Sequence, residues 1–281
     1  IADQKARSGY VLGVWLRECV GRIRSWYFVA MKGQELVDGK DRPLWWRMEH
    51  SGGLWALVLV DEAYAQGQGF DGVEASLEQG PRWSQWRSSR WALQLLWNPA
   101  ADALGANPFP MDLRKEPSGK PYLMNSGGVA VPVALAHTVG MGAAALADHP
   151  SLVGIGVDVE RYSERFLRVA SRISSMEDIA KVQGCVAGAL EAEAAVLIWV
   201  IKEACYKAAL TQEGLFGKNQ LITRIEKKED SIVVDEPRWI GCVESNPAEA
   251  SECPCERIEF EAGSFSQDHA LWYWAVAWRK G

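Results

Sequence analysis

Apolar and polar positions repeat with different periods along the chain, and each period predicts a different kind of element. Large side chains recur every three or four residues in the segment before Asn98-Pro99, which predicts a helix over 81–97 that ends there. A second long helix is predicted over 191–210, where Ala and Glu are frequent. Apolar runs bounded by Gly, Asp or Pro predict strands elsewhere, at 51–60, 129–138, 140–147, 153–160, 221–227, 231–235, 239–243, 257–261 and 269–278.

The spacing and composition of the predicted strands and loops suggest how these segments are arranged. The runs at 129–138, 140–147 and 153–160 are separated by short turns, which suggests an antiparallel meander. The last strand does not alternate between apolar and polar residues, as expected for a strand that is covered on both faces. The Gly- and Gln-containing segment 65–72 predicts a loop, and residues 1–35 predict short strands or one strand and a helix.

A faint internal repeat indicates the fold class. Trp86 and Arg90 have the same spacing as Trp199 and Glu203, and each predicted helix precedes a loop and then strands. We therefore expect an α+β fold of two similar halves, each a small antiparallel sheet packed with a long helix. The predicted domains are 1–150 and 151–281.

Composition excludes several classes of protein. The net charge of −6 argues against nucleic acid as the main partner, and no apolar run is long enough to span a membrane. The first residues do not resemble a signal peptide, and without an initiator Met we expect a trimmed amino terminus. The six cysteines lack the spacing of a zinc site, so we favour a reduced loop at Cys253-Pro-Cys255 and a cytoplasmic protein.

Two short segments carry the candidate chemistry. Asp158 and Glu160 are two residues apart at the end of a predicted strand and should share one face, where their repulsion would be relieved by a hard divalent cation such as Mg²⁺. Glu203 and Lys207 are four apart on a predicted helix and also share a face. One could complete the metal site while the other holds a phosphate. Taken singly, each segment also fits an ordinary strand end or a solvated helix.

Together the two segments resemble a known family. Gly-Ile-Gly-Val-Asp-x-Glu, followed about forty residues later by Trp-x-x-Lys-Glu-x-x-x-Lys, resembles the signature of the 4′-phosphopantetheinyl transferases. The single-chain, pseudo-dimeric type related to the surfactin-synthetase activator fits best. Such enzymes transfer the phosphopantetheine arm of coenzyme A to a serine of an acyl, polyketide or peptidyl carrier protein. The resemblance covers mainly residues 82–210.

The resemblance implies roles for individual residues. The metal ligands would be Asp158, Glu160 and Glu203, with Glu203 also the general base. Lys207 and His137 would act with it in catalysis. Coenzyme A would be bound by four residues from both halves, namely Arg90, Lys120 in Gly-Lys-Pro, His137 and Lys207. We expect a monomer.

The sequence also departs from the family pattern. Ala136 precedes His137 where the family usually has Ser in Ser-His-Ser or Ser-His-Thr, so one hydrogen bond to a phosphate oxygen would be lost. Phe166 and Glu177 are only approximate counterparts of the Phe and Glu that anchor a helix in the family. Carrier proteins are acidic, so basic clusters would have to attract them despite the negative net charge, at Arg82, Arg87 and Arg90, and at Arg114, Lys115 and Lys120.

Two other classes of function stay open. A catalytically weak homologue could bind coenzyme A or a carrier protein without transfer, which the Ala at 136 would suggest. Alternatively, the chain could be an interaction protein whose Trp-rich first half is a partner surface. A different nucleotide enzyme is disfavoured because the sequence contains neither a Walker loop nor a Rossmann glycine pattern.

Overall fold

The computed structural model describes twelve parts of the chain, at 37–38, 42–43, 45–49, 55–67, 83–104, 112–124, 128–147, 149–186, 191–209, 220–228, 237–245 and 257–281. The predictions for 1–35, for the strand at 231–235 and for Cys253-Pro-Cys255 lie outside these residues. No helix within them is long and apolar enough to cross a membrane.

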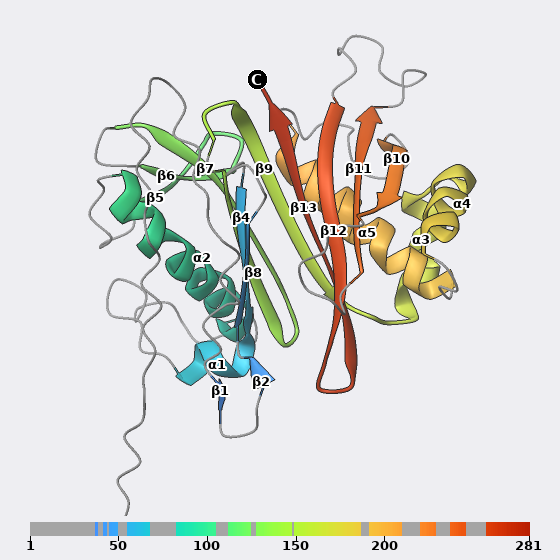
Figure 1. Ribbon diagram of the computed structural model, residues 1–281, viewed down its shortest axis with the longest axis horizontal. Helices are drawn as coiled ribbons and strands as arrows, with labels where there is room; N and C mark the ends of the chain where they lie inside the picture. Colours follow the sequence, from blue (N-terminus) through green and yellow to red (C-terminus); the bar gives the residue numbers. More distant parts are fainter. Residues whose placement is uncertain are drawn as a thin grey trace, which may run out of the picture.

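Two antiparallel sheets form the centre of the fold (Figure 1). The first sheet has the order β3-β4-β8-β7-β6-β5, with β3 Trp45–Glu49, β4 Trp55–Asp61, β5 Leu113–Lys115, β6 Pro121–Met124, β7 Ala130–Thr138 and β8 Met141–Ala147. The second has the order β10-β11-β12-β13-β9, with β9 Leu152–Arg161, β10 Gln220–Lys227, β11 Arg238–Ser245, β12 Arg257–Gln267 and β13 Ala270–Lys280. A small pair joins β1 Val37–Asp38 to β2 Arg42–Pro43.

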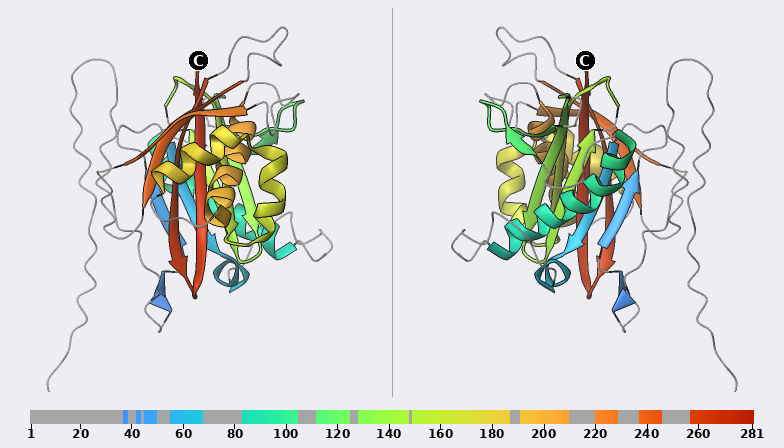
Figure 2. Two further views of the ribbon diagram at one scale, coloured as in Figure 1. Left: turned by 90° about the vertical axis from the view of Figure 1, so that its right-hand side faces the viewer. Right: turned by 90° about the vertical axis from the view of Figure 1, so that its left-hand side faces the viewer.

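Each large sheet carries a long helix on its outer face (Figure 2). Helix α2, Trp83–Leu104, covers the first sheet, and α1, Glu62–Gly67, packs beside it. Helix α5, Glu191–Ala208, covers the second sheet together with α3, Arg165–Ile173, and α4, Met176–Cys185. The α+β class with two similar halves is therefore confirmed. The division into 1–150 and 151–281 stays a prediction.

A third core lies between the two sheets. It joins Leu57 and Ala145 of the first sheet to Val157, Trp274 and Val276 of the second. Because alternate residues of a strand point to opposite faces, the neighbours Tyr273, Ala275 and Ala277 face α5 instead. The prediction that the last strand is covered on both faces is confirmed.

Three predicted details are wrong. Helix α2 continues past Asn98-Pro99 to Leu104, and residues 65–67 belong to helix α1 rather than to a loop. The predicted meander breaks after β8, because β9 pairs with β13 of the second sheet. One face of β9 is apolar and completes the core between the sheets, while its other face carries Gly154 and Gly156, which fit closely against α5, the helix that covers the second sheet.

Candidate active site

Strand β9 places the two predicted metal ligands beside helix α5. Two glycines, Gly154 and Gly156, precede Asp158 and Glu160 on the same face of the strand. A Cβ atom on Gly154 would overlap the carbonyl oxygen of Ala208, and one on Gly156 would overlap that of Ala204. The Gly-x-Gly pattern therefore lets α5 approach the strand closely, which brings its polar residues to the carboxylates.

Lys207 of α5 binds directly to the end of β9. Its Nζ donates to Oδ1 of Asp158 and to the backbone oxygen of Val157, both at 2.9 Å. Asp158 is 7% exposed, and its other oxygen, Oδ2, is buried without a hydrogen-bond partner. Burial raises the pKa of Asp158, and the ammonium group of Lys207 opposes this shift. A buried carboxylate oxygen with no donor is an open position for a cation.

Glu160 receives two donors on one oxygen. Thr138 Oγ1 donates to Oε2 at 2.9 Å, and Arg165 Nη2 donates to the same oxygen at 3.0 Å. The side chain of Glu160 is 15% exposed. Burial, and next the negative charge of Asp158, raise the pKa of Glu160 to about 7.

This raised pKa predicts how stability depends on pH when metal is removed with EDTA. Between pH 4.5, the usual pKa of Glu, and about 7, folded Glu160 holds a proton that the unfolded chain has released. The melting temperature should therefore fall as the pH rises through this window. Asp158, whose pKa is also raised, adds to the fall.

The Glu160→Gln variant tests this expectation, since its side chain does not titrate. Its melting temperature, followed by circular dichroism, should fall less than that of the wild type over the same window. Glu164→Gln, a change at an exposed position nearby, should keep the wild-type fall. Equal slopes for wild type and Glu160→Gln would contradict the prediction.

Glu203 lies at the same cluster, one helical turn before Lys207. Burial raises its pKa, the charge of Lys207 lowers it, and the charge of Asp158 raises it further. We call Asp158, Glu160, Glu203 and Lys207 the carboxylate cluster. The charges of Asp158 and Lys207 both act on the pKa of Glu160 and on that of Glu203.

The carboxylate cluster suits Mg²⁺ by the chemistry of its donors. Within the described residues no three acidic, His or Cys side chains already form a metal site. Mg²⁺, however, commonly takes one or two carboxylates and completes its coordination with water and substrate phosphate. The unpartnered Oδ2 of Asp158, with Glu160 two residues further along the strand, satisfies this smaller requirement.

The other predicted site residues lie on the first sheet and its helix. His137 is exposed at the end of β7, near enough for its charge to lower the pKa of Asp158. Lys120 follows Gly119 in the turn between β5 and β6, and Arg90 lies on α2 with its guanidinium 4.9 Å from the ring centre of Trp86. His137 thus lies within electrostatic range of Asp158, whereas Arg90 and Lys120 lie on separate elements. All these roles stay predictions.

Ala136 has a structural explanation. Its side chain is 4% exposed and lies in the core between the sheets. A serine hydroxyl there would be surrounded by apolar groups unless it found a hydrogen-bond partner, and burying it alone would be unfavourable.

Two residues of the site were missed by sequence reasoning. Thr138 and Arg165 both bind Glu160, and together with Val139, Arg161, Tyr162 and Ser163 they line a pocket of about 300 Å³ beside it. Thr138 had a signal in the sequence, because it is the last residue of the family's Ser-His-Thr pattern. Arg165 had none, since only the turn after β9 brings it back to Glu160.

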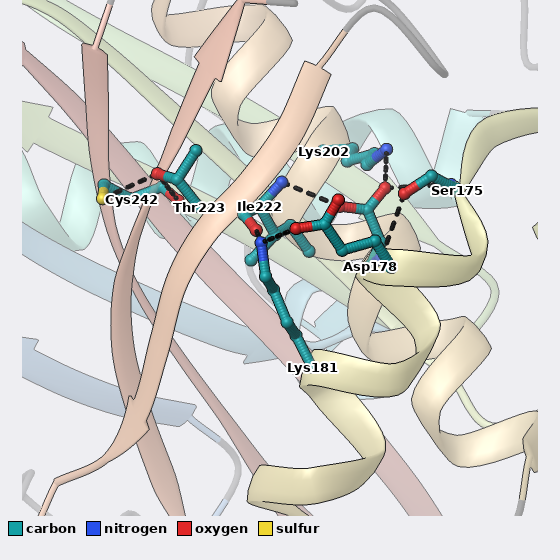
Figure 3. A network of polar contacts seen from close by, with 8 residues as sticks. Ser175, Asp178, Lys181, Lys202, Ile222, Thr223 and Cys242 are labelled. Atoms are coloured by element: carbon teal, nitrogen blue, oxygen red, sulfur yellow. Dashed lines mark hydrogen bonds and ion pairs between the residues drawn. The ribbon is translucent and has the colours of Figure 1, made fainter.

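A buried ion pair holds α5 in place (Figure 3). Lys202, adjacent to Glu203, donates to Asp178 Oδ2 at 2.8 Å and to the backbone oxygen of Ile173 at 2.6 Å. Asp178 Oδ1 accepts from the backbone N–H of Ile222, and Asp178 also forms a capping box with Ser175 at the start of α4. The pair ties α5 to α4, α3 and β10.

Of the two anchor residues that the resemblance suggests, one is buried in the core and the other is exposed at the surface. Phe166 is buried against Trp199, with ring centres 5.8 Å apart. Glu177, in contrast, has a side chain that is 68% exposed and pairs with Lys181. The buried carboxylate of α4 is that of Asp178, because Asp178 lies on the face of this helix that packs toward the second sheet.

Comparison with known proteins bears on the segment that carries the carboxylate cluster. Residues 154–250 match the family model of the 4′-phosphopantetheinyl transferase superfamily. The match spans β9, α3, α4, α5, β10 and β11, roughly a third of the chain. No curated protein matches the sequence. The match confirms a domain of this superfamily at these residues, while the pseudo-dimeric type stays a prediction.

Proposed function

We propose that this protein is a 4′-phosphopantetheinyl transferase of the single-chain, pseudo-dimeric type related to the surfactin-synthetase activator. It transfers the arm of coenzyme A to a serine of an acyl, polyketide or peptidyl carrier protein and releases 3′,5′-ADP. The family match between 154 and 250 supports phosphopantetheine transfer in general. The finer assignment rests on the geometry of the carboxylate cluster.

One observation carries the proposal. Nζ of Lys207 lies 2.9 Å from Oδ1 of Asp158, and the other oxygen of Asp158, Oδ2, is buried without a hydrogen-bond partner. Thr138, from the other sheet, donates a hydrogen bond to Glu160. An ammonium group, paired carboxylates and a hydroxyl group from the other sheet thus meet at one place. Because one chain supplies both sides, a monomer suffices. We place it in the cytoplasm, where the three described cysteines, all free, would stay reduced.

The divalent cation would be held by Asp158 and Glu160, with Glu203 as a third ligand or through water. When bound, it neutralises charge on the pyrophosphate of coenzyme A and on the departing phosphate. The residues that would hold the cation offer carboxylate oxygens, which are ligands that Mg²⁺ prefers.

The protein's own residues would carry the remaining chemistry. The serine oxygen forms a bond to the β-phosphorus, the bond from this phosphorus to 3′,5′-ADP breaks, and the serine proton passes to Glu203. The burial that raises the pKa of Glu203 makes it a better proton acceptor. Lys207 and Lys120 would hold phosphate oxygens, Arg90 would lie near the phosphates of coenzyme A, and His137 would hold its 3′-phosphate or its pyrophosphate.

The carrier protein would approach along α3. The exposed arginines Arg165, Arg168 and Arg172 lie on one side of this helix, opposite the buried Phe166 and Ala170, and begin beside Glu160. An acidic carrier would be attracted to this basic side although the whole chain is negative. This cluster differs from the two that the sequence predicted.

Reversing the charge of the exposed arginines on α3 should weaken binding of the carrier protein without lowering the rate of phosphopantetheine transfer. The Arg168→Glu/Arg172→Glu variant is expected to raise the KM for an acidic carrier by about tenfold, with kcat and the KM for coenzyme A nearly unchanged. Lys227→Glu, which reverses a single charge at an exposed position on β10 away from α3, should behave as wild type, and each single variant of Arg168 and Arg172 should still raise the KM for the carrier. Equal effects of the double variant and of Lys227→Glu would argue against docking on α3.

The direct test is the intact mass of an apo carrier protein incubated with this protein, coenzyme A and Mg²⁺, beside a sample with EDTA. A metal-dependent gain of one phosphopantetheine arm would establish the transfer. If several fatty-acid, polyketide and peptide carriers gain no mass although coenzyme A binds, the protein is a binding homologue and the proposal is wrong.

A further inference from the structure

Glu160 is held by a residue from the opposite sheet. Thr138, at the end of β7, donates to Oε2 of Glu160, which lies near the end of β9. The two residues are 22 apart in sequence, and their strands belong to different sheets. Arg165, from the start of α3, approaches the same oxygen. Two donors on one oxygen restrict the rotation of the carboxylate and leave the other oxygen, Oε1, for a ligand.

The hydroxyl of Thr138 is not required to hold its own turn. The turn between β7 and β8 is fixed by Glu62, whose Oε2 accepts from the N–H of Gly140 at 2.7 Å and whose N–H donates to Gly140 O at 3.0 Å. Strand pairing continues to the end, with Thr138 opposite Met141. Removing the hydroxyl should therefore change the environment of Glu160 and leave the turn in place.

We propose that Thr138 is a positioning residue, whose hydroxyl orients the carboxylate of Glu160 so that it can bind the divalent cation. The inference rests on the proposed function, because it assumes that Glu160 is a metal ligand. Partners that orient a ligating side chain commonly change metal affinity by roughly 10- to 100-fold. Glu160 is largely buried, so water can replace the lost hydrogen bond only in part.

The test compares Thr138→Val, which keeps the shape and loses the hydroxyl, with Thr138→Ser, which keeps the hydroxyl. Isothermal titration with Mn²⁺ alone, without coenzyme A, measures the Kd for metal. Thr138→Val should raise this Kd by about tenfold or more, and Thr138→Ser should stay within about threefold of wild type. Arg165→Gln should have a smaller effect than Thr138→Val, because the Arg165 side chain is 56% exposed.

Thr223→Val is the matched control. Thr223 is exposed on β10, and its hydroxyl contacts Cys242 at a site remote from β9, so Mn²⁺ affinity should not change. Melting temperatures check that each variant is folded. The inference is overturned if folded Thr138→Val binds Mn²⁺ like the wild type, if Thr138→Ser is as weak as Thr138→Val, or if the wild type shows no saturable Mn²⁺ binding.

The two proposals can fail separately. If no carrier gains mass but Mn²⁺ binding depends on the hydroxyl at 138, the transferase assignment is wrong and the positioning role stands. If the wild type modifies a carrier but folded Thr138→Val keeps both its Mn²⁺ affinity and its kcat, the positioning role is wrong and the transferase stands.

Discussion

Replacing Glu203 with Gln is expected to lower the rate of phosphopantetheine transfer by about a hundredfold or more. The amide cannot accept the serine proton and is a poorer ligand for a hard cation. The shape of the side chain is kept, and Glu203 is not part of the ion pair that anchors α5. The fall should therefore appear in kcat, with the fold unchanged.

The measurement is the initial rate of carrier modification at saturating coenzyme A and Mg²⁺. Glu191→Gln is a matched control, since it makes the same chemical change on the same helix at an exposed position in the first turn. It should retain nearly full activity. A Glu203→Gln protein with full turnover would exclude Glu203 both as base and as required ligand.

Asp178→Asn is expected to be the most destabilising of the substitutions considered, by about 3–5 kcal/mol, because it leaves the buried Lys202 ammonium without its counter-charge. Lys202 is 0% exposed and Asp178 is 1% exposed. Burial already lowers the pKa of Lys202, and the charge of Asp178 is the first of the influences that oppose it. In the variant, Lys202 must either stay charged in an apolar setting or lose its proton.

Urea unfolding, followed by fluorescence and circular dichroism, measures this loss. Glu177→Gln is the neighbouring control, because Glu177 pairs with Lys181 at the surface, where an ion pair contributes about 0.5 kcal/mol or less. The double variant Asp178→Asn/Lys202→Met should lose less than the sum of the two single variants, since no unpaired charge remains. Additive losses, or a loss no larger than in Glu177→Gln, would contradict the role given to the pair.

Much of the site could be predicted because its chemistry is local in the sequence. Asp158 and Glu160 follow from the alternation of one strand, and Glu203 and Lys207 from the period of one helix. The glycines before Asp158 were visible as a motif. The reason for them is the close approach of α5, which depends on how the helix packs on the strand and is not visible in the sequence.

Contacts between distant segments could not be predicted. The Asp178–Lys202 pair joins two helices, and Glu177 and Asp178 are equally acidic in the sequence, so only packing shows which one is buried. The hydrogen bond from Thr138 to Glu160 requires that β9 leave the first sheet and still lie against β7. The order of the strands along the chain does not contain that information.

Local periodicity determined the long helices, most strands, the α+β class and the acidic pair, since each depends on neighbours within a few residues. The tertiary structure alone decided the partner of β9, the burial of Ala136, the counter-charge of Lys202 and the donors to Glu160. These features depend on which faces of the two sheets and their helices pack together. That choice is made by the whole core, because burying apolar surface favours one arrangement of all the elements at once.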